Sequence, residues 1–395
     1  MGKTKADMPK LQIPDADKKL KKICQKGMVE LFGENPPEAV KDRLLHELKV
    51  VAGNKHSSYY LLASMLVEEA ERIHHAVFFR GTITGSLIAY TSGISKINPM
   101  EKEYGGVNLP FEVTREEYEC IEPTLDIQCS MAFIFFAQAF VAREMPEYRC
   151  VSYPLNSCNG IKAKPVRLYF IKNDALPLED HVDVEGSNLD EYPEFMFFDE
   201  YFHITIIGQD NMELVRYNTF YRDGISFNEA DSEKIIPKLW RYIKNNDDSI
   251  RGYKKLKVRS YEELITVLGM AHSTDVWGGV PKKMVLDGEL PLSQMIGTRD
   301  DLFSYFISLG IENEEAYTIM NRVRKGKGLS EEDEEKLRKN GAEEWVIALC
   351  MQARYIFPRA HIAQMIRRDA FCLYGAEEVT PSDCGHCVLQ DSFIG

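Results

Sequence analysis

The chain has 395 residues and a formal net charge of −13, with 44% hydrophobic and 28% charged residues. This composition is typical of a folded globular protein with ample core, and it excludes an intrinsically disordered chain. No apolar run approaches the roughly 20 residues that a membrane-spanning helix needs, and the N-terminal segment lacks the apolar stretch of a signal peptide. We therefore expect a cytoplasmic protein with no membrane partner. The acidic balance argues against binding of nucleic acid by the whole surface, but local basic patches can still bind it, because salt screens charges beyond about 8–10 Å.

The first half of the chain predicts a mixture of helices and strands. Residues 1–20 show no clear pattern and are expected to be a loose lead-in. A helix is expected from Pro37, because proline suits the first turn and apolar residues then recur at helical spacing. The further segments expected here are a helix over 57–75, a strand over 76–79, a helix near 85–93, and strands over 122–129, 166–171, 195–198 and 201–207.

After about residue 230 the pattern is helical throughout. Several segments begin with Ser, Asn or Asp, which are favoured caps of helix N-termini. The helices are expected over 232–246, 260–270, 299–310, 313–325, 330–340 and 342–357. The resulting prediction is an α+β fold with a lead-in over 1–20, an α+β domain over 21–245, a helical domain over 246–375 and a C-terminal tail over 376–395.

The segment RGTITGSLIAY, residues 80–90, places Gly81, Gly85 and Ser86 between a strand and the start of a helix. Backbone N–H groups at such a turn can hold phosphate, aided by the helix dipole. The alternative is a tight turn followed by a small residue that caps the helix. The segment by itself leaves both interpretations open.

Two basic segments in the helical region are further candidates for phosphate binding. Residues 320–340 carry Arg324, Lys325 and Lys327 in a cluster broken by glycines, and residues 352–371 carry Arg359 and His361 among aromatic side chains. Positive loops suit phosphates, and arginine with aromatic residues can hold a phosphate and stack on a base. The alternatives are a solvated helix end, where cations are favoured, and an amphipathic helix with a basic outer face.

The nine cysteines are odd in number and scattered, which favours reduced thiols over a disulfide framework. Cys384 and Cys387 form a Cys-x-x-Cys pair close to the C-terminal end. A zinc site would need two more ligands, and a redox site would need a thioredoxin-like strand and helix. Neither is evident, so the pair is assigned to the tail.

Several long segments together resemble the PolC-type α subunit of bacterial DNA polymerase III. AHSTDVWGG (271–279), IGTRDDLFSYFISLGI (296–311), the 320–340 segment and EEWVIALCMQARYIFPRAH (343–361) occur in the order of that family's fingers domain. RLLHELKVVAG (43–53) and RGTITGSLIAYTSGISKINPM (80–100) resemble the start of its palm domain. The resemblance covers about residues 10–375. It implies a truncated protein with a Polβ-like nucleotidyltransferase palm followed by all-helical fingers, and the family activity is DNA-directed DNA polymerisation.

The resemblance also implies which residues would bind nucleotide phosphates. In the family the arginine–glycine turn of the palm holds the incoming triphosphate, and basic residues of the fingers assist. The residues at the matching positions are Arg80, Gly81, Gly85, Ser86, Arg299, Arg324, Lys325, Lys327, Arg359 and His361. The implied ligands are a dNTP and a DNA primer–template, and replication proteins are the implied protein partners.

The metal-binding positions depart from the family pattern. The family's palm has a Pro-Asp-x-Asp segment; here Pro123 matches, Thr124 stands at the first aspartate and Asp126 at the second. Alternation along a strand puts positions 124 and 126 on the same side. A third aspartate comes from a later strand, and Thr205 stands at its position. Asp126 is thus the sole retained metal aspartate, and we expect it to hold at most one hydrated Mg²⁺ weakly, because threonine is neutral and a poor ligand for hard cations.

The favoured hypothesis is a pseudo-polymerase that retains binding of DNA, dNTP or replication proteins without efficient synthesis. The second hypothesis is an active or weakly active polymerase whose metal ligands are rearranged, with Glu122, Glu200 or Asp210 as substitute acids. The third is a protein-interaction module that mimics the replicase and binds its partners, which the net charge of −13 favours.

Overall fold

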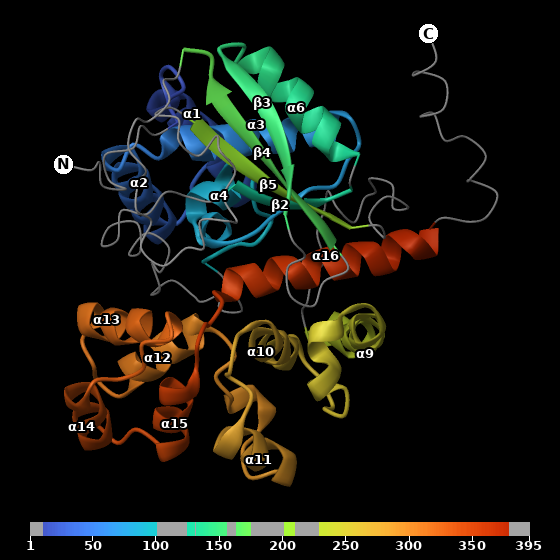
Figure 1. Ribbon diagram of the computed structural model, residues 1–395. Helices are drawn as coiled ribbons and strands as arrows, with labels where there is room; N and C mark the ends of the chain where they lie inside the picture. Colours follow the sequence, from blue (N-terminus) through green and yellow to red (C-terminus); the bar gives the residue numbers. More distant parts are fainter. Residues whose placement is uncertain are drawn as a thin grey trace.

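The computed structural model describes residues 11–100, 125–130, 132–155, 163–174, 201–209 and 229–378. These residues form a mixed α+β fold, which confirms the predicted class. A five-stranded sheet with its helices makes up one half of the molecule, and a helical assembly lies beside it (Figure 1). We call residues 11–209 the sheet half and residues 229–378 the helical half. None of the helices in the described part of the chain combines the length and apolar character that crossing a bilayer requires.

The sheet has the strand order β1-β2-β5-β4-β3. Its strands are β1 (Phe78–Phe79), β2 (Leu125–Cys129), β3 (Tyr148–Pro154), β4 (Ala163–Lys172) and β5 (Tyr201–Gln209). β2 and β5 pair in parallel, whereas the other neighbours pair antiparallel. The central pair therefore joins two strands that are far apart in sequence, and its register decides which side chains meet.

One face of the sheet is apolar. Because successive side chains of a strand point to opposite faces, Leu125 and Ile127 of β2 share this face with Ile204 and Ile206 of β5 and with Leu168 of β4. These residues are buried in one hydrophobic cluster with side chains of the neighbouring helices. The helices of the sheet half are α1 (Ala16–Phe32), α2 (Glu38–Gly53), α3 (Ser57–Arg72), α4 (Leu87–Thr91) and α6 (Phe133–Glu144).

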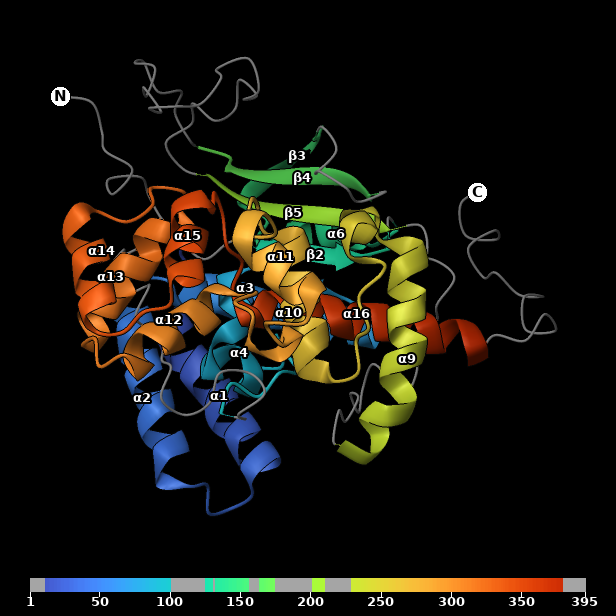
Figure 2. The same cartoon turned by 90° about the horizontal axis from the view of Figure 1, so that it is seen from below.

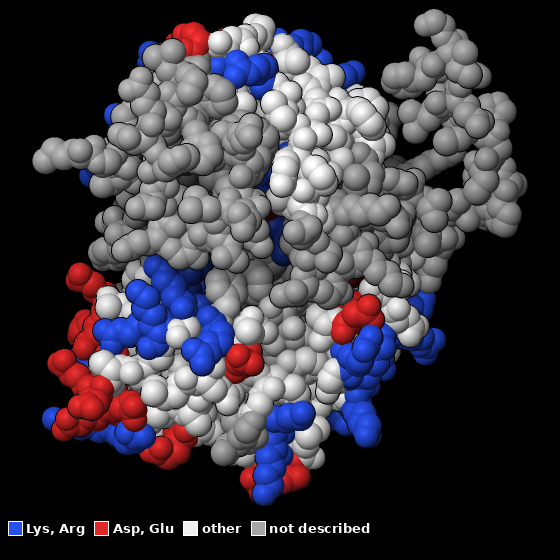
Figure 3. Space-filling view, viewed as in Figure 1, with Lys and Arg blue, Asp and Glu red and all other residues white. Residues whose placement is uncertain are grey.

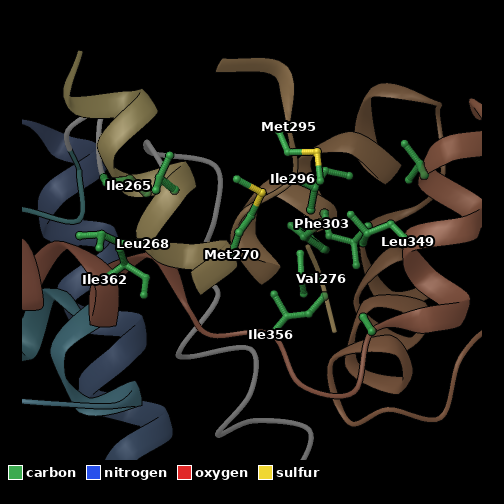
Figure 4. Packing of buried hydrophobic residues seen from close by; sticks show 14 of the residues in the cluster. Ile265, Leu268, Met270, Val276, Met295, Ile296, Phe303, Leu349, Ile356 and Ile362 are labelled. Atoms are coloured by element: carbon green, nitrogen blue, oxygen red, sulfur yellow. The ribbon is translucent and has the colours of Figure 1, made fainter. Parts of the chain in front are cut away.

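The helical half has its own hydrophobic cluster, part of which is shown in Figure 4. Ile265, Leu268 and Met270 pack there with Phe303 and Leu349, and all are buried. Its helices are α9 (Glu229–Asn246), α10 (Tyr261–His272), α11 (Gly279–Asp287), α12 (Arg299–Ser308), α13 (Asn313–Arg324), α14 (Glu331–Lys339), α15 (Glu344–Gln352) and α16 (Arg359–Glu378).

Helix α16 belongs to the helical half and lies where this half meets the sheet half (Figures 1 and 2). It packs against α9, α10 and α12 of the helical half and against β1 and the 3₁₀ helix η2 (Thr82–Gly85) of the sheet half. Phe371 contacts Phe78, with ring centroids 5.6 Å apart. Gln364 donates from Nε2 to Ser95 Oγ at 2.8 Å, and both residues are buried. The halves thus share one packed helix.

Most of the predicted elements are confirmed. The helix from Pro37 is α2, the helix over 57–75 is α3, and the six helices predicted after residue 230 correspond to α9, α10 and α12–α15. The strand over 166–171 is the inner part of β4. The strand predicted over 195–198, Cys384 and Cys387 all lie outside the described residues.

Some predictions were wrong or incomplete. The lead-in expected up to residue 20 ends earlier, since α1 begins at Ala16. The helix expected over 342–357 ends at Gln352, because Arg354 and Tyr355 leave it to bond to the backbone of Thr274. No element was predicted from the sequence at α1, α6, α11 or β3. The domain boundary at 245 stays a prediction, although buried residues of α9 belong to the core of the helical half.

Helix α2 contains a buried ion pair, and the carboxylate of this pair also binds the backbone of α4. Glu47 is fully buried, accepting from Arg43 Nε at 2.8 Å and from the Ile88 N–H at 2.9 Å. Burial raises the pKa of Glu47, and the Arg43 guanidinium partly opposes this rise. The carboxylate satisfies an N–H in the first turn of α4, a group that has no partner within the helix.

We predict that Glu47→Ala lowers the free energy of unfolding by about 3 kcal/mol, because it removes the charge that offsets the buried Arg43 and the acceptor of the Ile88 N–H. Urea unfolding followed by circular dichroism measures the change. The matched control is Glu38→Ala on the same helix, where an exposed pair with Lys41 is lost and a change below about 1 kcal/mol is expected. Equal effects of the two substitutions would contradict the role assigned to Glu47.

Candidate functional site

Polar side chains cross three strands on the second face of the sheet. Asp126 of β2 lies directly opposite Thr205 of β5, and Thr205 lies opposite Arg167 of β4. Directly opposed residues share a face, so the three side chains form a row. Arg167 donates from Nε to Thr205 Oγ1 at 3.3 Å. We call Asp126, Thr205 and Arg167 the polar row.

Arg80 adds a second guanidinium beside this row. It follows β1 directly, and its backbone N–H donates to the Asp126 carbonyl at 2.8 Å. Burial raises the pKa of the Asp126 carboxyl group, while Arg80, the Thr205 hydroxyl and Arg167 act to lower it, and the net direction is upward. Asp126 is thus a partly exposed carboxyl group between two cations.

The polar row differs from the ligand set that a pair of divalent cations needs. Mg²⁺ is held through oxygen ligands, above all carboxylates, and a two-metal site needs several of them around ions about 3.5–4 Å apart. The polar row supplies one carboxylate and one hydroxyl, with two guanidinium groups close by. Nowhere in the described ranges do three or more His, Cys, Asp or Glu side chains gather as metal ligands would. The described residues therefore do not fit a metal pair; Thr124, Glu122, Glu200 and Asp210 lie outside them.

The glycine turn predicted to bind phosphate is engaged within the protein. Gly81 has φ 78°, a conformation that favours glycine, and its N–H donates to His361 Nδ1 at 3.1 Å. Gly85 ends η2. The next residue, Ser86, is 1% exposed and caps α4 by accepting from the Ala89 N–H at 3.0 Å. This geometry matches the tight turn and helix cap that the sequence left open as the alternative.

His361 of α16 joins this turn to the helical half. It is buried, stacks on Phe357 at a centroid distance of 4.5 Å, and lies with Nε2 3.3 Å from an Arg80 nitrogen. Burial, together with the charges of Arg80 and of neighbouring cationic groups, holds the pKa of His361 well below its usual value of 6.5. The neutral ring is what accepts the Gly81 N–H, because a protonated ring has no acceptor.

The predicted basic residues of the helical half fall into two groups. Arg299, Arg324 and Arg359 are buried, with exposed fractions of 1%, 3% and 7%. Arg359 pairs with Asp301 at 3.2 Å and with Glu262, so it is part of the framework between α10, α12 and α16.

Lys325 and Lys327, by contrast, are exposed. They flank Gly326, whose φ is 73° and which packs closely against the backbone of Arg354, another exposed cation. We call Lys325, Lys327 and Arg354 the basic loop patch. Figure 3 shows Lys and Arg side chains gathered on the helical half close to the sheet half, beside a strongly acidic area.

Sequence reasoning missed one residue of the site. Arg167 was placed in a predicted strand but was not considered as a site residue. The signal available was a charged side chain inside the apolar strand VRLYFI. Its position beside Thr205 depends on the pairing of β4 with β5, which no local pattern reveals.

The chain is similar to DNA polymerase III proteins of bacteria. The family described as bacterial DNA polymerase III alpha NTPase domain matches residues 18–132. DNA polymerase III PolC-type of Staphylococcus aureus is 24% identical over 89% of this chain and 31% of its own length. The proteins of the same name from Pediococcus pentosaceus and Bacillus subtilis are 25% and 22% identical, each over 92% of this chain and 32% of their own. The chain thus spans about a third of the length of these relatives. The alignment with the Staphylococcus aureus protein has 451 positions and is longer than the chain, so that relative has residues that the chain lacks.

We predict that His361 makes folding sensitive to pH. The folded protein keeps the ring neutral while the unfolded chain takes up a proton below pH 6.5, so this contribution is fully present above pH 6.5 and is lost as the pH falls. The loss is at most about 1.4 kcal/mol per pH unit. In His361→Asn the free energy of unfolding should therefore fall less between pH 7 and pH 5 than in the unmodified protein. The control is the exposed His46→Asn; an unchanged slope in His361→Asn would contradict the assignment.

Proposed function

Because the chain is PolC-like and related to PolC-type DNA polymerase III over about nine-tenths of its length, we propose that it is a catalytically silent member of the replication machinery. In this proposal a palm-like domain of the Polβ type spans residues 21–245 and contains most of the sheet half together with α9, and a fingers-like domain spans residues 246–375 and contains the rest of the helical half. The protein binds primer–template DNA and nucleotide but does not extend a primer efficiently. The observation that supports it is the polar row, in which Thr205 stands opposite Asp126 with Arg167 on its hydroxyl.

The loss of negative charge at the metal-binding positions accounts for the proposed loss of activity. Two-metal phosphoryl transfer uses carboxylates to hold both cations, which activate the attacking hydroxyl and stabilise the charge that develops. A threonine at this position supplies no charge, and a guanidinium on its hydroxyl repels a divalent cation. Losing several kcal/mol of transition-state stabilisation slows a reaction by orders of magnitude, since each 1.36 kcal/mol is tenfold.

DNA binding is proposed for the basic loop patch. Its three cations are exposed, and phosphate contacts by such residues supply most of the affinity of non-specific DNA binding. The buried Arg299, Arg324 and Arg359 would act by holding the framework under this surface, whereas the family resemblance assigns them to phosphate. We further propose that a dNTP binds at the palm-like domain and that Asp126 holds at most one hydrated Mg²⁺ weakly, because the described residues do not fit a metal pair.

We predict no primer extension by the full chain with dNTPs and Mg²⁺ or Mn²⁺, because the polar row does not support a metal pair. Gel analysis of a labelled primer–template measures this, with a PolC-type polymerase as the positive control. Extension that disappears in Asp126→Ala would refute the silent-polymerase proposal. It would favour an active enzyme that recruits other acids, such as Glu122, Glu200 or Asp210.

We predict that the double substitution Lys325→Ala and Lys327→Ala weakens binding of primer–template DNA by roughly tenfold at low salt, since two phosphate contacts are lost, and lowers the slope of log K against log salt by about 2. Fluorescence anisotropy with a labelled duplex measures both quantities.

The matched control replaces two adjacent, exposed lysines of α11, Lys282 and Lys283, with alanine. This control removes the same net charge and should leave affinity nearly unchanged. Equal weakening by both double substitutions would show a general charge effect and contradict a specific patch. Absence of DNA binding, with co-purification of replication proteins, would favour a protein-interaction module.

A further inference from the structure

We propose that the polar row, with Arg80, is a metal-independent binding site for the phosphate groups of a nucleoside triphosphate, in which the Arg167 guanidinium takes the place of a divalent cation. The inference rests on the proposed function, since it names the small ligand of the same site. It assigns a role to Arg167 that neither the resemblance nor the basic segments indicated.

The charge balance of the site favours an anion. Asp126 contributes at most one negative charge, whereas Arg80 and Arg167 each contribute a positive one, so the three groups together are positive. A site for divalent cations requires the opposite balance, in which carboxylates outnumber cations. Guanidinium groups match the planar, bidentate geometry of phosphate oxygens and form charge-assisted hydrogen bonds with them.

The position of Arg167 is fixed by its neighbours. Nε donates to Thr205 Oγ1 and Nη1 to the Tyr169 hydroxyl, both at 3.3 Å. Among the described residues no hydrogen bond engages the remaining nitrogen, Nη2, so it is available to a further acceptor. A preorganised donor loses little conformational entropy when a ligand binds.

The polar row is partly exposed, and a buried amide lies next to it along the same face of β2. Asp126 and Arg167 are each partly exposed. Gln128, two residues beyond Asp126 on the same side of β2, is fully buried, and neither of its amide atoms has a hydrogen-bond partner in the described parts of the chain. A buried amide without partners is costly, and a polar ligand reaching this face would reduce that cost.

Calorimetric titration of the full chain in EDTA tests the proposal, with inorganic triphosphate and dATP as separate probes. We expect both probes to bind, with a Kd that changes less than about threefold when Mg²⁺ replaces EDTA. Arg167→Gln should weaken binding about 10- to 100-fold, since it removes a charged hydrogen bond, and Arg167→Lys should restore part of the loss. The matched control is Arg143→Gln on α6, which removes an exposed guanidinium that contacts Glu69 and Glu144 and should leave the Kd unchanged.

Asp126→Asn separates the anion site from a metal site by the sign of its effect. At an anion site the lost negative charge tightens triphosphate binding in EDTA by roughly 3- to 10-fold, by relieving repulsion between like charges. At a metal site the same change weakens binding that depends on Mg²⁺. If Arg167→Gln unfolds, which thermal unfolding detects, the Arg167→Lys variant and the sign of the Asp126→Asn effect decide.

The outcomes separate this inference from the proposed function. No binding in EDTA, binding that requires Mg²⁺, or an unchanged Kd in Arg167→Gln would each overturn the metal-independent site, while DNA binding and the absence of extension would be unaffected. Primer extension would refute the silent polymerase whatever the triphosphate titration shows. Binding of inorganic triphosphate as tight as that of dATP would support the proposal, because the site would then recognise the phosphate groups without the nucleoside.

Discussion

The parallel pairing of β2 with β5 is the constraint on which the site depends. It places Asp126 opposite Thr205, which lies some 80 positions later in the sequence. A shift of one residue in this register would move every side chain of the shifted strand to the other face of the sheet. The apolar residues of both strands lie in the core on one side, so their burial holds the register. The same register places Asp126, Thr205 and Arg167 in one row on the other side. The composition of the site is therefore fixed by the packing of the core behind it.

Helix α16 is the second element that determines the site. Its first turn carries His361, which accepts the Gly81 N–H, and later turns carry Gln364 and Phe371, which contact the sheet half. Buried polar contacts of this kind require defined geometry, because an unpaired buried group is costly. Arg80 lies between His361 and Asp126, so it links the polar row to the helical half.

Local sequence patterns predicted the elements whose signals are local. The helices of the second half were found from apolar spacing and from caps, and the structure has capping boxes at Thr298 with Asp301 and at Ser330 with Asp333. Helix α6 was missed because Phe133–Glu144 is apolar on nearly all sides and has no clear helical period. The end of α15 could not be foreseen, because Tyr355 is held by Thr274, about 80 residues earlier.

The site was predicted less completely than the fold, since its chemistry depends on contacts between distant residues. Sequence reasoning found Asp126 and Thr205 but could not place Arg167 against them, and it could not separate the buried Arg299 and Arg324 from the exposed Lys325 and Lys327.

Because Arg167 is part of the polar row, the folded sheet does not need a bound cation to balance the charge of Asp126. An edge built from several carboxylates repels itself until a cation binds, so its geometry depends on the metal. Here Arg167 donates to the Thr205 hydroxyl, Thr205 lies directly opposite Asp126, and Arg80 adds a further positive charge. The neutralising charge is part of the chain and is present whenever the sheet is formed. The row is therefore assembled by folding alone, which makes a function in binding, without metal-dependent chemistry, physically consistent with the rest of the structure.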